Sequence, residues 1–483
     1  MIKPRVPVSE QSPLTRKENF SEVCYGYSLE QAFEEACRCL SCKTPACVSR
    51  CPVGIDIPGF ISCLKNKDLA GAYGIVSKYT SLPAVCGRVC PQEEQCESGC
   101  ILGKKSEPVS IGKLERYVGD WALDNDIKPR QAKEKNGYRV AVVGSGPAGL
   151  TCAGELAAMG YEVTVFEALH EPGGVLAYGI PEFRLPKEKV VKKEIRRIEE
   201  MGVRIQTDVI IGRTLTIDEL IIQEKFEAVF IGSGAGLPRF MNIKGENSKG
   251  VFSANEILTR INLMKAYNKE YDTPVRLGKR VVVVGGGNVA MDAARASLRM
   301  GCEVTIVYRR GEDELPARRE EVHHAKEEGI VFNLLSNPVE IITGEDGWVK
   351  AVRCIRMELG APDSSGRRRP VEVKGSEFEI PTDTVIMAIG TSPNPLITSV
   401  TPDIKVNSER CIVTDGECRT SKTAVYAGGD AASGAATVIL AMQAGKKAAA
   451  SIDLMIKNRY KFVPFRYRDE IDYKVLDIIY ERI

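Results

Sequence analysis

The sequence predicts an α/β protein with an additional α-helical region at its amino end. Eleven of the sixteen cysteines lie in the first 100 residues, among short stretches with helical spacing. Further along, a β-branched run, a glycine-rich turn, a helical stretch and a second strand occur twice, about 140 residues apart. Each repeat is typical of a parallel sheet that binds a dinucleotide. We therefore expect an α-helical domain followed by two Rossmann-like domains.

Composition favours a soluble protein of several domains. The chain has 483 residues, of which 43% are hydrophobic and 27% charged, and its net charge is +2. A charge this close to zero gives no overall attraction to nucleic acid or to an acidic membrane surface. No apolar stretch reaches the roughly 18 residues of a membrane span, and the first residues do not resemble a secretory signal. We expect a cytoplasmic protein with no nucleic-acid or membrane partner.

The motifs divide the chain into segments. The cysteines occupy a predicted helical domain at 1–125, and a polar linker follows it. One nucleotide domain is predicted to interrupt the other, with 138–270 and 381–460 as the two parts of the first domain and 271–380 as the inserted domain. The last segment, 461–483, is aromatic and charged and has no motif that indicates a role.

The first glycine-rich turn has the pattern G-x-G-x-x-G between a predicted strand and a predicted helix. Its backbone can approach a pyrophosphate, whose charge then lies at the helix amino end. Glu167 ends the next strand, 23 residues after Gly144, where a carboxylate can bind ribose hydroxyls. The alternative is a purely structural glycine turn. The candidate residues of this loop are Gly144, Gly146, Pro147, Ala148 and Gly149.

The second glycine loop is a G-x-G-x-x-A variant, and the strand after it ends in Arg309 and Arg310. A carboxylate there would repel a 2′-phosphate, whereas guanidinium groups bind it. The pattern therefore predicts an NADP(H) site, although the two arginines could also be a solvated surface pair. His323 and His324 are expected at the surface of a charged helix. The other NADP(H) candidates are Gly285, Gly287, Asn288, Val289, Ala290, Arg318 and Gly390.

The cysteine block predicts metal binding through thiolates. A disulfide framework is not expected in a reducing compartment, and none of the three histidines lies in the block. Eight thiolates suffice for two [4Fe–4S] clusters, but counting does not assign them, and any four could also hold zinc. Two runs resemble ferredoxin cysteine runs that include a Cys-Pro pair: Cys39-x2-Cys42-x4-Cys47-x3-Cys51-Pro52 and Cys86-x3-Cys90-Pro91-x4-Cys96-x3-Cys100.

These motifs, with GIPEFRLPK at 179–187 and AGGD at 427–430, resemble flavoprotein reductases with two dinucleotide domains. Residues 20–120 resemble the N-terminal iron–sulfur domain of the glutamate synthase small subunit, of dihydropyrimidine dehydrogenase and of the large subunit of NADH-dependent reduced ferredoxin:NADP oxidoreductase. The resemblance covers nearly the whole chain and implies that the first loop binds FAD. The further FAD contacts that it implies are Val89, Glu167, Gly173, Gly174, Arg184, Gly429, Asp430, Thr437 and Val438.

The resemblance also implies interleaved cluster ligands. One [4Fe–4S] cluster takes Cys39, Cys42, Cys47 and Cys100, and the other takes Cys51, Cys90, Cys96 and the carboxylate of Glu115. A carboxylate keeps the single negative charge of a thiolate, and a changed ligand shifts the reduction potential. From spacing alone, Glu115 would be an ordinary acid on a helix surface. The remaining cysteines of the block, Cys24, Cys37, Cys63 and Cys86, are expected to be small buried hydrophobes.

Together these parts imply an electron-transfer enzyme. NADPH passes a hydride to FAD and the clusters carry single electrons, so we assign no catalytic acid, base or nucleophile. The resemblance favours the FAD/iron–sulfur subunit of an electron-bifurcating transhydrogenase, with ferredoxin and a smaller NAD-reducing flavin/iron–sulfur subunit as partners. One alternative is the glutamate synthase small subunit, which delivers NADPH electrons to an amidotransferase. Another is a zinc-stabilised, redox-inactive module that senses NADPH.

Overall fold

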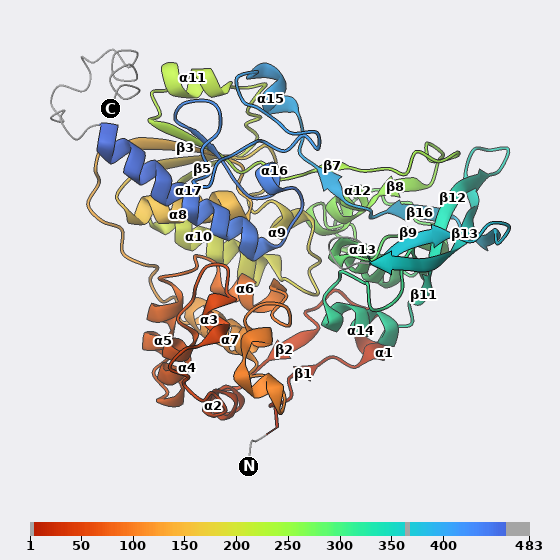
Figure 1. Cartoon of the computed structure of the whole chain (residues 1–483), viewed down its shortest axis with the longest axis horizontal. Coiled ribbons are helices and arrows are strands. Elements are labelled where there is room, and N and C mark those ends of the chain that lie inside the picture. Colours follow the sequence, from red (N-terminus) through yellow and green to blue (C-terminus); the bar gives the residue numbers. More distant parts are fainter. Residues whose placement is uncertain (1–3, 363–367, 460–483) are drawn as a thin grey trace. The chain divides into compact units, whose positions relative to one another are not determined.

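The computed structural model describes residues 4–362 and 368–459 (Figure 1). The predicted tail at 461–483 lies outside these residues. The chain divides into two compact units, which we describe in turn. The first unit consists of Met1–Ile127, Gly173–Ile195 and Ala235–Pro393, and the second of Lys128–Pro172, Arg196–Gly234 and Asn394–Ile483. In the described part of the chain, no helix is long and apolar enough to cross a membrane.

Short capped helices build the amino-terminal part of the first unit. Ser28 forms a capping box at the start of α2, and the carboxylates of Asp56 and Asp68 accept hydrogen bonds from backbone N–H groups at the starts of α4 and α5. These caps explain why helices of only two turns begin where they do. The helices are α1 (Pro13–Arg16), α2 (Leu29–Cys37), α3 (Ala46–Ser49), α4 (Ile57–Lys65), α5 (Leu69–Val76), α6 (Pro83–Val89) and α7 (Ile111–Asp124), with an antiparallel pair β1 (Ser9–Glu10) and β2 (Cys24–Gly26).

The first unit also contains a five-stranded parallel sheet in the order β11-β10-β9-β16-β8. Its central strand β9 is a buried run of valines, as expected for a parallel sheet covered on both faces. The strands are β8 (Val251–Ser253), β9 (Arg280–Val284), β10 (Glu303–Tyr308), β11 (Val331–Leu334) and β16 (Thr384–Met387), and the associated helices are α12 (Ala254–Leu258), α13 (Asn288–Arg299) and α14 (Arg319–Glu327).

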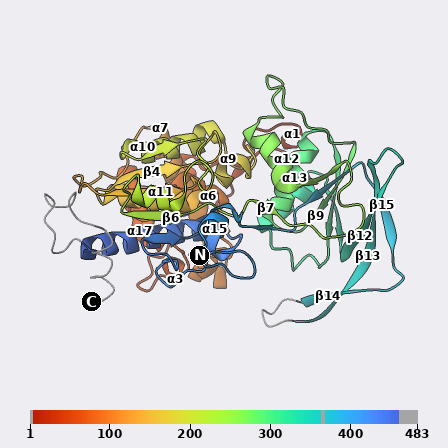
Figure 2. The ribbon, with the colours of Figure 1, turned by 90° about the horizontal axis from the view of Figure 1, so that it is seen from above.

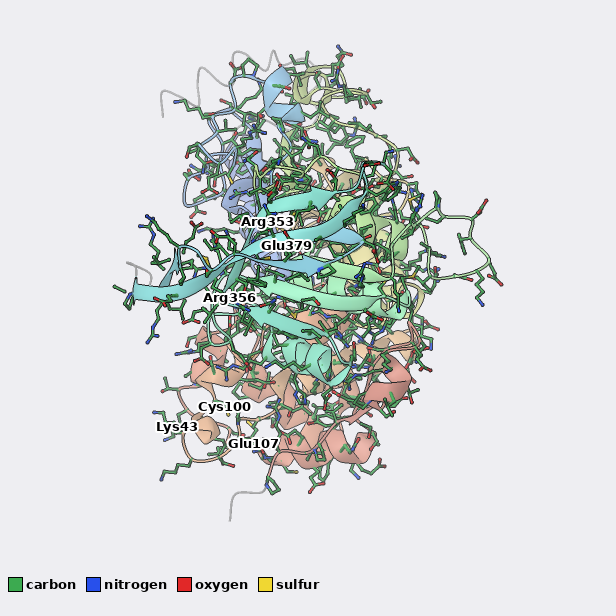
Figure 3. The ribbon with its side chains drawn as sticks, turned by 90° about the vertical axis from the view of Figure 1, so that its right-hand side faces the viewer. Lys43, Cys100, Glu107, Arg353, Arg356 and Glu379 are labelled. Atoms are coloured by element: carbon green, nitrogen blue, oxygen red, sulfur yellow. The ribbon has the colours of Figure 1, made fainter. Side chains whose placement is uncertain are left out.

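An antiparallel sheet extends from this nucleotide sheet, and its arm at β14 is visible in Figure 2. Arg353 of β13 pairs with Glu340 and Glu379 on the two neighbouring strands, and Figure 3 shows Arg353 beside Glu379. Such cross-strand charge pairs support the register. The strands are β12 (Ser336–Thr343), β13 (Val349–Pro362), β14 (Arg368–Glu372) and β15 (Phe378–Pro381).

The second unit is built around another five-stranded parallel sheet, in the order β18-β6-β3-β4-β5. Helix α17 lies against α8, as Figure 1 shows, because Gly445 lets the two backbones meet. The elements are β3 (Arg139–Val143), α8 (Pro147–Ala158), β4 (Glu162–Phe166), β5 (Arg204–Gln206), α11 (Ile217–Ile222), β6 (Ala228–Ile231), α15 (Leu396–Val400), β18 (Val425–Ala427), α16 (Asp430–Ser433) and α17 (Val438–Arg459).

The α/β fold class and the inserted arrangement agree with the sequence prediction, but the boundaries differ. Strands β8 and β16 both belong to the sheet of β9, so this sheet takes residues from outside the predicted range 271–380. A short antiparallel pair, β7 (Leu237–Pro238) with β17 (Thr391–Ser392), joins the two connections to it. The segment Gly173–Ile195, which was predicted within the first nucleotide domain, groups with the first unit. It contains α9 (Val175–Tyr178) and the start of α10 (Lys192–Glu200).

Candidate functional site

In the second unit, the first glycine loop leaves a helix amino end open. Gly144 has φ +96° and leads from β3 into the loop, where a Cβ would lie 2.6 Å from the Gly232 carbonyl oxygen. A Cβ at Gly149 would lie 1.9 Å from the Gly144 carbonyl oxygen, so this position also requires glycine. At Gly146, in contrast, a Cβ would meet nothing within 4 Å, and no side chain caps α8. The free N–H groups of α8 can therefore receive a phosphate.

Glu167 follows β4 at the same edge of this sheet. Its Oε2 accepts hydrogen bonds from the Ser145 N–H at 2.9 Å and the Ser145 hydroxyl at 2.5 Å, and its Oε1 accepts one from the Leu169 N–H at 2.9 Å. These bonds fix a buried carboxylate directly beside the glycine loop. Each carboxylate oxygen can accept more than one hydrogen bond, so the group retains capacity for ribose hydroxyls.

The AGGD segment and α17 approach the same glycine loop. Gly429 has φ +62°, and its backbone passes close to the start of α8. A Cβ at this position would lie 2.9 Å from the Ala148 Cβ. Asp430 accepts a hydrogen bond from the Ala436 N–H at 3.2 Å, and burial raises the pKa of its carboxyl. Thr437 precedes Val438, the first residue of α17, and its hydroxyl accepts a weak hydrogen bond from the Leu440 N–H. The second unit thus brings together the predicted FAD residues of the segments 144–167 and 429–438.

The other four predicted FAD residues belong to the first unit and stay predictions. Gly173 and Gly174 both have positive φ, and Val89 ends α6 as a buried residue. Arg184 forms ion pairs with Asp292 at 2.6 Å and Glu321 at 2.9 Å, so its guanidinium is already engaged within its own unit.

The NADP(H) loop lies at the carboxyl end of β9. A Cβ at Gly285 would lie 2.3 Å from the Ala388 carbonyl oxygen, so the loop passes close to the chain that leads from β16 to Gly390. At Gly287 a Cβ would meet nothing within 4 Å, and no side chain caps α13. Ala290 is buried and Val289 is exposed at the start of this helix. The loop therefore offers the same free N–H groups as the first one, at the end of β9, which lies between β10 and β16 in the sheet.

The three predicted arginines differ in what they contact. Arg309 is exposed just beyond β10, and no hydrogen bond or ion pair engages its side chain among the described residues. Arg310 donates a hydrogen bond to the Arg368 carbonyl oxygen at 3.0 Å, which ties it to β14. Arg318 is buried and donates to the Arg88 carbonyl oxygen at 2.7 Å and to Glu320. Arg309 is thus the arginine that is available for a 2′-phosphate.

Seven of the eight predicted cluster ligands fall into two groups by electrostatic coupling. Burial raises the pKa of the Cys47 thiol to about 11, and Cys39 and Cys100 add to this effect. Burial likewise raises the pKa of Cys96, with Glu115 and Cys51 among the further causes. The pKa of Cys90 is raised first by its hydrogen bond with Cys86 and by burial, and further by Glu115. The resemblance implies the same two ligand sets. Cys42, the eighth, is half-buried close to the first group in sequence.

Glu115 is the buried carboxylate of the second group. Within the described part of the chain its Oε1 has no hydrogen-bond partner, and burial, with the nearby Glu194, raises its pKa to about 8. A buried carboxyl oxygen without a partner is costly unless a ligand completes it. The residues therefore fit a cluster that Glu115 would help to bind. The expectation from spacing alone, an acid on a helix surface, is wrong for Glu115.

The two groups differ in exposure. Cys90 and Cys96 are buried and Cys51 is half-buried, whereas Cys39, Cys42, Cys47 and Cys100 are all half-buried. Figure 3 shows Cys100 on the outside of the helical domain, with Lys43 and Glu107 nearby. In the described part of the chain, no three Cys, His, Asp or Glu side chains are close enough to hold a single metal ion.

Two expectations about other residues are corrected. Of the four remaining cysteines, Cys86 is buried, but Cys37 is exposed and Cys24 and Cys63 are half-buried. His324 is buried rather than exposed. Its Nε2 lies 2.9 Å from the carboxylate of Glu10 in β1, so β1 contacts α14 at this residue. His323 is exposed as expected.

A buried ionic network was not foreseen from the sequence. Glu328 pairs with Arg16 at 2.9 Å, with Arg295 at 2.7 Å and with Arg299 at 2.8 Å. Arg295 also pairs with Glu321, which links this group to Arg184. The network joins the amino-terminal segment, α13 and the end of α14. The signal available in the sequence was the charged residues Asp292, Arg295 and Arg299 of α13, which are all buried in the structure.

Comparison with known proteins agrees with this geometry. A family model for dihydropyrimidine dehydrogenase domain II, 4Fe-4S cluster, matches residues 16–127, and one for pyridine nucleotide-disulphide oxidoreductase matches residues 138–445. The structure of FprA, a Mycobacterium tuberculosis oxidoreductase, shares the fold, with a TM-score of 0.58 and 22% identity over 69% of this chain and 88% of FprA.

Curated relatives are more similar in sequence. The Escherichia coli protein named glutamate synthase [NADPH] small chain is 36% identical over 446 residues, which are 90% of this chain and 94% of that protein. The Moorella thermoacetica protein named NADP(+)-dependent formate dehydrogenase subunit beta is 38% identical over 440 residues, which are 86% of this chain but only 60% of that longer protein.

The chain therefore belongs to the pyridine nucleotide-disulphide oxidoreductase family, in a branch that carries an N-terminal 4Fe-4S domain. It is an NADP-dependent flavoprotein oxidoreductase whose cofactors are FAD, 4Fe-4S clusters and NADP(H). This result confirms the cofactor prediction and removes the zinc-stabilised sensor as an alternative.

Proposed function

We propose that this chain is the NADP(H)-linked subunit of an electron-bifurcating transhydrogenase. In this role it exchanges a hydride with NADP(H), sends one electron through two [4Fe–4S] clusters to ferredoxin, and gives the other to a smaller flavin/iron–sulfur subunit that reduces NAD⁺. The observation that carries the proposal is the pair of ligand groups in one helical domain, one buried and one half-buried. Such a pair suits electron transfer from the protein interior to a soluble one-electron carrier.

In this proposal, separate sets of residues bind NADP(H), FAD and the two clusters. The open amino end of α13 and the unengaged Arg309 would bind the pyrophosphate and 2′-phosphate of NADP(H). The open amino end of α8, with Glu167 and Asp430, would bind FAD. When bound, FAD links two-electron hydride transfer to single-electron steps, and the clusters carry single electrons. No side chain needs to donate or remove a proton for hydride transfer.

The ligand groups would hold the two clusters in different surroundings. Cys51, Cys90, Cys96 and Glu115 would bind the cluster in the interior, where the environment excludes water. Cys39, Cys42, Cys47 and Cys100 would bind the cluster near the surface. Burial and hydrogen bonding set the potential of such clusters, so the two are expected to differ.

Sequence segments support this branch of the family. The stretches 26–30, 54–61 and 88–97, like the amino-terminal Lys3-Pro4-Arg5-Val6-Pro7, resemble the ferredoxin-linked transhydrogenase subunit more than the bacterial glutamate synthase small subunit. The structure describes all of these except Lys3. The segment 88–97 contains both Cys90 and Cys96, so this resemblance falls on the proposed interior cluster.

The second candidate is a glutamate synthase small subunit, which is favoured by the match to 94% of the Escherichia coli small chain. In that case the electrons would pass to a separate amidotransferase subunit. Residues 20–120 resemble both candidates, so the partner decides between them.

The native complex tests the proposal directly. The complex is purified anaerobically, its subunits are identified by mass, and its iron, sulfide and flavin contents are measured. Ferredoxin-dependent reduction of NADP⁺ that requires NADH, or the reverse reaction, supports the transhydrogenase. NADPH oxidation that requires glutamine and 2-oxoglutarate supports the second candidate and contradicts the first.

A further inference from the structure

Helices α6 and α7 meet through glycines, which brings the proposed ligands of the interior cluster together. A Cβ at Gly87 would lie 2.4 Å from the Arg116 backbone nitrogen, and a Cβ at Gly119 would lie 2.6 Å from the Ala84 backbone nitrogen. Helix α6 ends immediately before Cys90, and α7 carries Glu115. The relative position of these two helices therefore fixes the distance between a thiolate and a carboxylate of one ligand group.

Glu194, from a distant part of the first unit, holds the amino end of α6. Its side chain is 1% exposed, and its Oε1 accepts a hydrogen bond from the Ala84 N–H at 2.8 Å. No local side chain caps this helix, because Leu82 occupies the N-cap position and Pro83 follows it. Glu194 thus provides, from 110 residues further along the chain, the acceptor that the local sequence lacks.

Glu194 also lies close to Glu115. Gly119 is one helical turn from Glu115 and therefore on the same face of α7. Since Gly119 contacts Ala84 and Ala84 donates to Glu194, the two carboxyl groups are held on the same side of the α6–α7 contact. The influence of Glu194 on the pKa of Glu115, second to burial, agrees with this placement.

We propose that Glu194 is a positioning residue for the interior cluster, which fixes α6 against α7 and places a negative charge beside the ligand group. This inference rests on the proposed ligand set that includes Glu115. A negative charge in a poorly solvated region disfavours the addition of an electron, so Glu194 lowers the reduction potential of this cluster relative to the other.

Two substitutions in the full-length chain separate the charge from the hydrogen bond. Glu194→Gln keeps an acceptor for the Ala84 N–H and removes the charge, whereas Glu194→Ala removes both. Glu200→Gln, an exposed acid on the same helix α10, is the matched control. Each protein is purified anaerobically, and the potentials of both clusters are measured by redox titration followed by EPR, with iron and flavin contents as checks.

In Glu194→Gln we expect one cluster to become easier to reduce while the other is unchanged. A tenfold change in the electron-sharing equilibrium between the clusters would appear as a separation of about 59 mV. In Glu194→Ala we expect, in addition, a loss of iron from that one cluster. Unchanged potentials in Glu194→Gln together with full iron content in Glu194→Ala would overturn the proposal, as would equal shifts of both clusters.

The ligand assignment is tested separately from the role of Glu194. Glu115→Ala must disturb the same cluster that responds to Glu194→Gln. If Glu115→Ala alters one cluster and Glu194→Gln alters only the other, the ligand group is retained but the proposed role of Glu194 is wrong. If Glu115→Ala alters neither, the ligand group itself is wrong and the inference falls with it.

Discussion

At the scale of single residues, Arg309 is expected to determine the preference for NADPH. Its guanidinium is exposed at the carboxyl end of β10 and has no partner in residues 4–362 and 368–459, whereas Arg310 donates a hydrogen bond to the Arg368 carbonyl oxygen. Replacing Arg309 with Gln should remove a charge-assisted contact worth about 1.5–3 kcal/mol, or roughly 10- to 150-fold in the Kd of NADPH. Isothermal titration with NADPH and NADH measures this change. An equal loss for both nucleotides, or a larger selective loss in Arg310→Gln, would contradict the assignment.

Glu115 is the residue that distinguishes the two proposed clusters. Because its buried Oε1 has no hydrogen-bond partner among the described residues, Glu115→Ala should remove one ligand and alter the EPR signal of one cluster only. Glu94→Ala, which changes an exposed acid in the same domain, should leave both signals unchanged. If both signals also survive Glu115→Ala, Glu115 is not a ligand.

Local features of single residues could be predicted from the sequence, but their long-range partners could not. The glycines of both loops could be predicted because their backbone conformations and close approaches are properties of a local pattern. The surroundings of Arg184, Arg318 and His324 could not, since each pairs with residues far away in the chain: Asp292, Arg88 and Glu10 respectively. Glu115 was reached only by resemblance, because its spacing from Cys100 does not reveal that it is buried.

At the scale of elements, the contact between α17 and α8 is expected to shape the FAD loop. A Cβ at Gly445 would lie 2.2 Å from the Ala148 carbonyl oxygen, and this atom belongs to the backbone. Gly445→Ala should therefore push α17 away from α8 and weaken FAD binding by about 5- to 150-fold, if the overpacking cost of about 1–3 kcal/mol falls on the FAD-bound form. Flavin content and fluorescence titration of the apoprotein measure it. Gly416→Ala, where a Cβ meets nothing within 4 Å, is the control, and an equal loss of FAD there would refute the role of the contact.

The buried network around Glu328 predicts how the stability of the first unit depends on pH. Although burial raises the pKa of this carboxyl, hydrogen bonds from Arg299 and Arg295 outweigh it and lower the pKa to about 2. A lowered pKa in the folded state means that Glu328 stabilises the fold above its unfolded pKa of about 4.3. This contribution is lost as the pH falls from that value towards 2.

Replacing Glu328 with Gln should therefore destabilise the protein at pH 7 by about 3–5 kcal/mol, because each of three buried arginines loses an ion pair. The difference in free energy of unfolding between variant and wild type should shrink as the pH falls below about 4. Denaturant unfolding between pH 7 and 3 measures it, with Glu303→Gln as an exposed control. A constant difference across this range would be incompatible with the ion pairs as its source.

At the scale of the whole molecule, the order of the domains could be predicted but their limits could not. The motif at 280–308 reveals only one strand–helix–strand unit, which is β9, α13 and β10. The strands β8 and β16 that complete the sheet lie before and after it in the sequence, and neither carries a motif of its own. Their membership follows from pairing with β9 and with each other, which is a property of the assembled sheet.

The segments 43–50 and 101–107, which lie beside ligands of the half-buried group in the sequence, carry four exposed basic residues and one exposed acidic residue. Lys43, Arg50, Lys104 and Lys105 are exposed next to Cys42, Cys47 and Cys100 in sequence, and Glu107 is an acidic neighbour. Figure 3 shows Lys43 and Glu107 on the same side of the helical domain as Cys100. Although the chain as a whole is almost neutral, this surface would attract an acidic one-electron carrier such as ferredoxin.

Reversing this local charge tests the route by which electrons leave the molecule. In Lys43→Glu/Lys104→Glu/Lys105→Glu, NADPH-driven reduction of an acidic ferredoxin should slow by about tenfold or more at low salt, because electrostatic steering is lost. Added salt should narrow the difference from wild type, since it screens the attraction. Reduction of a small neutral dye should be unchanged, as should both cluster signals, and Lys374→Glu on the loop after β14 serves as the control. If ferredoxin reduction is unaffected while the clusters remain intact, electrons leave by another surface.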